Sequence, residues 1–116
     1  MYNFEKLIVW KKAISLVEYV YKTQVKLPKE ERFELGSQLR RAVTSIPLNI
    51  AEGSSNPSRK VFKQHVTIAR GSLYEVVAIL KIINKVYRID VKDSLVFCDN
   101  VGRLLSGLIK SLTTNN

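Results

Sequence analysis

The residues best suited to bind a ligand are cations between positions 60 and 88, which recur with one tyrosine at spacings of three, four and seven. These spacings place them along one face of an α-helix. Glu75 is the only acid between Pro57 and Ile89, so acids on the same helix do not neutralise the row. Phosphate backbones are the usual partner of such a row, which predicts a nucleic-acid-binding face. The alternative is an ordinary solvated helix face. The row consists of Lys60, Lys63, Arg70, Tyr74, Lys81, Lys85 and Arg88.

Five further cations are expected to extend this positive field. They are Lys11, Lys12, Arg40, Arg41 and Arg59. The sequence contains neither a zinc-finger motif nor an aromatic-rich RNA-recognition motif, so base-specific readout is not expected. The predicted ligand is therefore the backbone of RNA or DNA.

A line of polar residues runs along the helix predicted for residues 33–53, and two more polar residues face it if the next helix packs antiparallel. We expect these side chains to form a structural hydrogen-bond network, because buried polar atoms need partners. The alternative is a catalytic or metal site with Glu52 and Glu75 as its two carboxylates. Bundle di-metal sites use four carboxylates and Glu-x-x-His units, which disfavours that alternative here. The predicted network comprises Arg41, Ser45, Asn49, Glu52, Ser72 and Glu75.

The side chains most often used in catalysis are scarce. His65 is the only histidine and Cys98 the only cysteine. We expect His65 to be a packing or exposed residue of a helix and Cys98 to be an inert core residue. The sequence therefore predicts no catalytic residue, no metal site and no cofactor, and the protein is not expected to be an enzyme. A single cysteine also favours a reducing compartment, and we expect a cytoplasmic protein.

Length and composition indicate one compact domain over residues 1–116. Nineteen Lys and Arg against ten Asp and Glu give a formal charge of +9, and 46% of the residues are hydrophobic. That hydrophobic fraction excludes a disordered basic tail, so the excess positive charge lies on the surface of a folded domain. The longest apolar run, residues 7–10, is far shorter than the roughly 20 residues that cross a bilayer, so no membrane partner is expected.

Hydrophobic periodicity predicts an all-α protein with helices at about 8–26, 33–53, 57–87 and 91–112. The third is the longest, and its apolar positions form an unbroken heptad seam from Phe62 to Tyr87. The short connections favour an antiparallel up-down-up-down four-helix bundle. Pro47 predicts a kink in the second helix, and Gly53 is expected to end that helix in the left-handed region.

Two helices carry more apolar residues than one bundle core needs. In the first helix, we expect the core face to comprise Trp10, Ala13, Ile14, Val17, Val20 and Tyr21, with Val9, Leu16 and Tyr19 beside it. The third helix has a second line that comprises Ile68, Ser72, Glu75, Ile79, Ile82 and Val86. Exposed apolar surface of this extent predicts self-association, unless other parts of the chain cover it.

Three segments resemble a known family. They are FEKLIVWKKA at residues 4–13, QLRRAVTSIPLNIAEG at 38–53 and GSLYE at 71–75. In this order they are similar to the small four-helix-bundle proteins encoded by intervening sequences in bacterial 23S ribosomal RNA genes. The chain also resembles the accessory variability proteins of diversity-generating retroelements, which use the same type of bundle.

The resemblance implies a homo-oligomer, commonly a homopentamer, without catalytic residues or a cofactor. It carries over no binding residue. The favoured hypothesis is a non-enzymatic oligomeric protein that binds nucleic acid through its basic surface. The alternative hypothesis is a protein-interaction scaffold or accessory subunit, for example of a reverse transcriptase.

Overall fold

The computed structural model describes residues 1–113, which contain helices and no strand. Four long helices form most of the molecule, as the hydrophobic periodicity predicts. A 3₁₀ helix, η1, precedes them, and a single-turn helix, α2, lies between the first two. The bounds are η1 Asn3–Lys6, α1 Ile8–Gln24, α2 Lys29–Phe33, α3 Leu35–Ser54, α4 Arg59–Tyr87 and α5 Lys92–Thr113. The long helix predicted for residues 57–87 is confirmed as α4, which has 29 residues.

The helix ends differ from the predicted ones by a few residues, for local reasons. The first helix ends at Gln24 rather than residue 26. Glu34 has a backbone conformation outside the helical region (φ −98°, ψ −87°), so residue 33 belongs to α2 and the second long helix begins at Leu35. The third long helix, α4, begins at Arg59 rather than at residue 57. Ser58 is its N-cap and accepts a hydrogen bond from the Val61 N–H at 3.2 Å.

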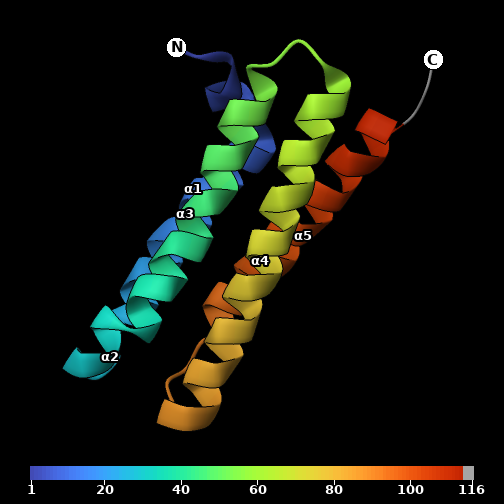
Figure 1. Cartoon of the computed structure of the whole chain (residues 1–116). Helices are drawn as coiled ribbons and strands as arrows, with labels where there is room; N and C mark the ends of the chain where they lie inside the picture. The colour runs from blue at the N-terminus through green and yellow to red at the C-terminus, as the bar shows by residue number, and fades with distance from the viewer. Residues whose placement is uncertain (114–116) are drawn as a thin grey trace.

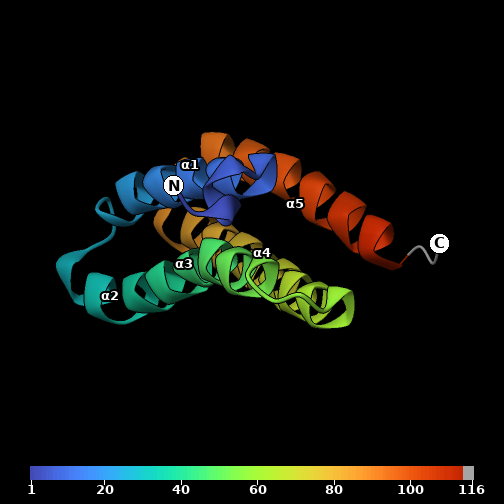
Figure 2. The same ribbon diagram turned by 90° about the horizontal axis from the view of Figure 1, so that it is seen from above.

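Each long helix contacts two of the others, in the order α1, α3, α4, α5 and back to α1. Figure 2 shows α1 and α5 in one layer and α3 and α4 in the other. In Figure 1 the α3–α4 connection lies at the end where the chain begins, whereas α2 and the α4–α5 connection lie at the opposite end. The described chain measures 50 × 24 × 19 Å along its principal axes. No helix in this part of the chain combines the length and apolar character needed to cross a bilayer.

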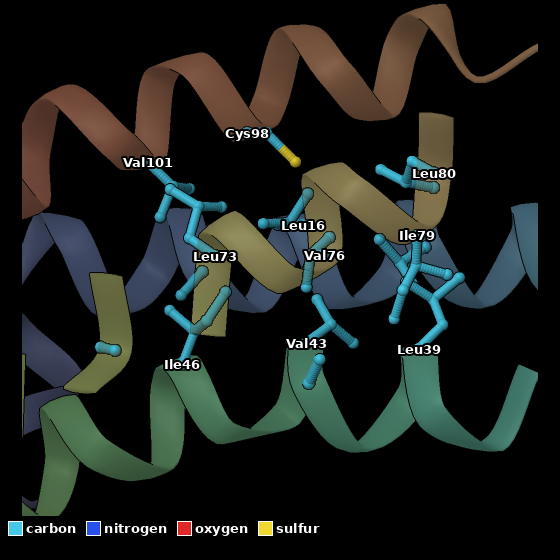
Figure 3. Packing of buried hydrophobic residues seen from close by; sticks show 14 of the residues in the cluster. Leu16, Leu39, Val43, Ile46, Leu73, Val76, Ile79, Leu80, Cys98 and Val101 are labelled. Carbon is cyan, nitrogen blue, oxygen red and sulfur yellow. The ribbon is translucent and has the colours of Figure 1, made fainter. Parts of the chain in front are cut away.

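The core lies between the two layers. Figure 3 shows Val43 and Ile46 of α3 and Val76 of α4 directed into the space between the helices, toward Leu16 of α1 and Cys98 of α5. The heptad seam of α4 supplies most of the core contribution of that helix. Its six central positions are buried, namely Val66, Ala69, Leu73, Val76, Leu80 and Ile83.

The core face predicted for the first helix is partly wrong. Ala13 and Val20 are buried as expected. However, α1 is rotated so that Val9 and Leu16, which the sequence assigned to surplus surface, are buried as well. Tyr21 is instead 39% exposed. The other three residues of the predicted core face are half-buried, namely Trp10, Ile14 and Val17. Tyr19 stacks on Phe97 of α5 with ring centroids 4.3 Å apart, because α5 covers that side of the helix.

Two expectations for the second helix concerned its backbone. Pro47 is buried inside α3, which continues to Ser54, and the kink expected there stays a prediction. The expectation for Gly53 is wrong, because Gly53 is a helical residue and no glycine of the described chain has a positive φ. The left-handed cap occurs instead at Arg88, where φ is 57° at the end of α4.

Candidate nucleic-acid interface

The outer face of α4 carries the predicted basic row. Lys60, Lys81 and Lys85 are exposed along the helix, and Arg88 is exposed at its C-terminal cap. Lys63 and Arg70 are half-buried on the side that faces α5. The Arg70 guanidinium lies 3.5 Å from the Ser106 hydroxyl of α5, so the row borders the α4–α5 seam.

No carboxylate neutralises these cations within residues 1–113. Glu75 is the only acid of α4, and its carboxylate accepts a hydrogen bond from the Gln38 amide of α3 at 3.4 Å. Glu75 is therefore directed toward α3, away from the cations. None of the six cations forms an ion pair in the described chain. The helix thus presents a row of positive charge whose counter-charge must come from solvent ions or a polyanion.

Four of the other predicted cations lie elsewhere. Lys11 and Lys12 are exposed on α1, in the opposite layer from α4 (Figure 2), so they do not extend the α4 face. Arg41 is exposed on α3. Arg40 is half-buried and donates to the Gln24 amide oxygen at 2.6 Å and to the Arg32 carbonyl at 3.2 Å. The Arg40 guanidinium therefore links α3 to the end of α1, and its place on a binding surface stays a prediction.

Part of the predicted polar network forms a chain of hydrogen bonds between α3 and α4. The Ser45 and Ser72 hydroxyls lie 2.8 Å apart. The Asn49 amide nitrogen donates to the Ser45 carbonyl at 2.9 Å and to its hydroxyl at 3.1 Å. The Asn49 amide oxygen lies 3.0 Å from Nδ1 of His65. These four side chains, all half-buried, link the two helices across their contact.

The direction of these bonds follows from counting donors. Since the Asn49 nitrogen donates to the Ser45 hydroxyl, that hydroxyl is free to donate its own hydrogen to Ser72. The Asn49 oxygen is an acceptor only, so Nδ1 of His65 must carry the hydrogen. Neutral His65 is therefore the Nδ1–H tautomer.

Gly53 lies one helical turn after Asn49 and meets the same histidine. A Cβ atom on Gly53 would lie 2.6 Å from Cβ of His65 and 3.0 Å from Phe62 Cδ1. The glycine is thus required by the close approach of α3 and α4, rather than by a turn of the chain. Asn49 and Gly53 together make His65 a packing centre of the α3–α4 contact.

Three predicted members lie outside this cluster. Glu75 is bonded to Gln38, as described above. Arg41 and Glu52 are exposed, and in the described chain their side chains contribute no hydrogen bond to the cluster. A shallow pocket between α3 and α4 opens beside the cluster. Its lining residues are Gln38, Arg41, Ala42, Ser45, Ser72 and Glu75.

Sequence reasoning missed His65 as the partner of Asn49, although a signal was present. The cross-helix pairs are Gln38 with Glu75, Ser45 with Ser72 and Asn49 with His65. As residue numbers rise along α3, those of the partners fall along α4. Continued to Asn49, the registers of the first two pairs point to residues 64–68 of α4, a range that contains His65.

The remaining titratable groups show two perturbed pKa values. Burial, aided by the Asp99 charge, raises the pKa of the Cys98 thiol to about 12. Tyr87 donates a hydrogen bond to the Glu31 carboxylate of α2, and this bond, burial and the negative charges of Glu31 and Glu30 raise the Tyr87 pKa. Within residues 1–113, no three His, Cys, Asp or Glu side chains gather as ligands of a metal ion would.

Comparison with known proteins adds one positive finding. A family model described as 23S rRNA-intervening sequence protein matches residues 5–109. This range includes all four long helices except the last residues of α5. It also includes the basic row and the Asn49–His65 cluster. No curated protein matches the chain.

Proposed function

Since the chain belongs to the 23S rRNA-intervening sequence protein family, we propose that it is a non-enzymatic, oligomeric four-helix-bundle protein that binds RNA or DNA backbones through the outer face of α4. The observation that carries the proposal is the unneutralised charge of that face. Six cations border or line it, and the only acid of α4 is bonded to Gln38 on the α3 side. A phosphate backbone supplies the missing negative charge and releases counterions as it binds.

The proposal treats residues 1–116 as one up-down-up-down domain in the cytoplasm, with a bend at Pro47. The antiparallel arrangement is supported by the opposed register of the α3–α4 hydrogen bonds and by the positions of the helix connections (Figure 1). A reducing compartment suits a chain whose only cysteine is free and buried.

Self-association, as a homopentamer in our proposal, is supported by apolar side chains that the described chain leaves exposed. On α4 these are Ile68, Ile82 and Val86, which are 53%, 47% and 63% exposed. Ile79 of the same predicted line is buried. A protein partner, such as a reverse transcriptase, is the alternative occupant of this apolar line. A cyclic assembly would repeat the basic face in every protomer and strengthen its field.

The test of binding is a salt titration with a matched pair of charge-reversal variants. The first carries Lys60→Glu, Lys63→Glu, Lys81→Glu and Lys85→Glu on α4. The second carries Lys6→Glu, Lys22→Glu, Lys26→Glu and Lys29→Glu, which are exposed positions outside α4. Each set lowers the formal charge by eight, from +9 to +1.

For the wild type, log affinity should fall with log salt by about 0.7 to 0.9 per neutralised phosphate. The α4 variant should bind more weakly and with a flatter slope, equally for all sequences, because backbone contacts carry no base information. The second variant should retain most of the affinity. Equal losses in both variants would show that net charge matters and the α4 face does not, and absence of wild-type binding at physiological salt would refute the function itself.

A further inference from the structure

Tyr74 is an aromatic side chain on the basic face with no packing role in the described bundle. It is 64% exposed, whereas Phe62 and Tyr87, the other Phe and Tyr residues of α4, are half-buried. No ring contact or hydrogen bond of its side chain occurs within residues 1–113. The faces of a tyrosine ring are apolar, so an exposed ring gains free energy when it stacks on a ligand and leaves water.

The surface around Tyr74 is open. Of the four positions one turn from Tyr74, Gly71 and Ala78 are small and exposed, whereas Arg70 and Val77 are half-buried. A Cβ atom on Gly71 would meet nothing within 4 Å. The ring is thus open on the side of Gly71 and Ala78, where a planar ligand can approach it.

Cations flank the ring on both sides. Arg70 precedes Tyr74 by one turn, and Lys81 follows it by two, which corresponds to about 6 Å and 10 Å along the axis. Lys63 and Lys85 each lie 11 residues from Tyr74, or about 16 Å along the axis on either side. A polyanionic strand that crosses the Tyr74 ring can therefore contact positive charge on both sides of it.

We propose that Tyr74 is a stacking platform for one base of a single-stranded nucleic acid whose phosphates lie on the flanking cations. The inference rests on the proposed function and specifies its substrate as single-stranded. A planar aromatic ring between cations is the arrangement by which single strands are held without sequence preference, since every base has a π-face. In a duplex the bases are stacked on one another, so a duplex meets only the cations.

The stacking position differs from the apolar line proposed for self-association. At about 100° per residue, Ile82 and Val86 lie roughly a quarter-turn or more around the helix from Tyr74. The two surfaces of α4 can therefore be occupied at once. Substitution of Tyr74 is expected to leave the oligomeric state unchanged, which separates loss of stacking from loss of assembly.

The test compares mixed-sequence single-stranded RNA, single-stranded DNA and the DNA duplex of equal length, each fluorescently labelled, by anisotropy titration. Tyr74→Ala should weaken binding of both single strands by about tenfold or more, whereas duplex affinity changes less than twofold. Tyr74→Phe keeps the ring and should bind like the wild type. Tyr21→Ala removes an exposed tyrosine of α1 and is the matched control.

A second readout reports stacking directly. Single strands that contain 2-aminopurine should change in fluorescence on binding the wild type and Tyr74→Phe, and not on binding Tyr74→Ala at saturation. Circular dichroism and sedimentation check that each variant keeps its fold and assembly.

The outcomes separate the two proposals. Equal weakening of single strands and duplex by Tyr74→Ala, or no weakening, overturns stacking while binding through the cations stands. If only RNA responds, the platform is specific for RNA strands; if both respond, it recognises bases of either. If the wild type binds no nucleic acid, the proposed function fails and the platform fails with it.

Discussion

The amide oxygen of Asn49 on α3 lies 3.0 Å from Nδ1 of His65 on α4. One turn later on α3, Gly53 approaches the same histidine so closely that a Cβ atom would lie 2.6 Å from His65 Cβ. Both residues belong to the SIPLNIAEG segment by which the chain resembles its family. Asn49 and Gly53 therefore hold α3 and α4 close together, so this part of the segment has a structural role in helix packing.

Replacing Asn49 tests the hydrogen-bond cluster. Asn49→Ala should lower the free energy of unfolding by about 1 to 3 kcal/mol, because it leaves half-buried groups of Ser45 and His65 without their partner. Glu52→Ala, on the exposed side of the same helix, should change it by less than about 0.5 kcal/mol. Urea denaturation measures both. If Glu52→Ala lowers the free energy of unfolding as much as Asn49→Ala does, Glu52 belongs to the hydrogen-bond network.

Two glycines in helix interiors should respond in opposite directions to alanine. Gly71→Ala adds a methyl group where nothing lies within 4 Å, and should stabilise the protein by about 0.5 to 1 kcal/mol through helix propensity. Gly53→Ala gains the same propensity but forces α3 away from His65, and should destabilise by about 1 to 3 kcal/mol. Thermal or chemical unfolding gives the two signs, and stabilisation by both substitutions would contradict the close approach at Gly53.

The buried Cys98 thiol should make stability fall at alkaline pH. Its pKa of about 12 in the folded protein exceeds the ordinary value of 9.0, so above pH 9 the folded state binds more protons than the unfolded state. Between pH 8 and pH 10.5 the wild type should therefore lose about 2 kcal/mol more stability than Cys98→Ala, which has no thiol to ionise. Both proteins share the titration of lysine and tyrosine. Parallel pH profiles would show that the thiol ionises without hindrance in the fold.

The apolar line of α4 should determine assembly. Ile82→Ser combined with Val86→Ser removes two exposed apolar side chains from one helix face and should shift the protein toward smaller species in sedimentation velocity. Ile8→Ser combined with Val96→Ser removes two equally exposed apolar side chains from α1 and α5 and serves as the control. A wild-type monomer at micromolar concentration and moderate salt would refute self-association, and an equal shift in both variants would relocate the interface.

The helices themselves could be predicted, because their signals are local. The heptad seam of α4 needs only its own residues, and the cap residue Ser58 acts on a neighbour three positions away. The pairing of Ser45 with Ser72 could be expected as well, once two adjacent helices are assumed to run antiparallel. The absence of acids from the basic row is likewise a property of one helix.

Which apolar residues form the core was decided by the tertiary structure. The apolar arc of α1 is wider than the surface its neighbours cover, and the contacts with α3 and α5 select Val9 and Leu16 over Ile14 and Tyr21. Arg40 could not be distinguished from a free surface cation until Gln24, on another helix, proved to be its acceptor. Periodicity reports the angle of a residue around its own helix, and it contains no information about where the neighbouring helices lie.

The sequence by itself therefore determined the four long helices and their approximate bounds, the basic row and the family, since each depends on residue types and spacings along the chain. Only the tertiary structure decided that Gly53 permits a close helix contact, that His65 completes the bond from Asn49, and that no neighbouring element covers Tyr74. These depend on distances between helices. Such distances are set by the packing of all side chains together, to within tenths of an ångström.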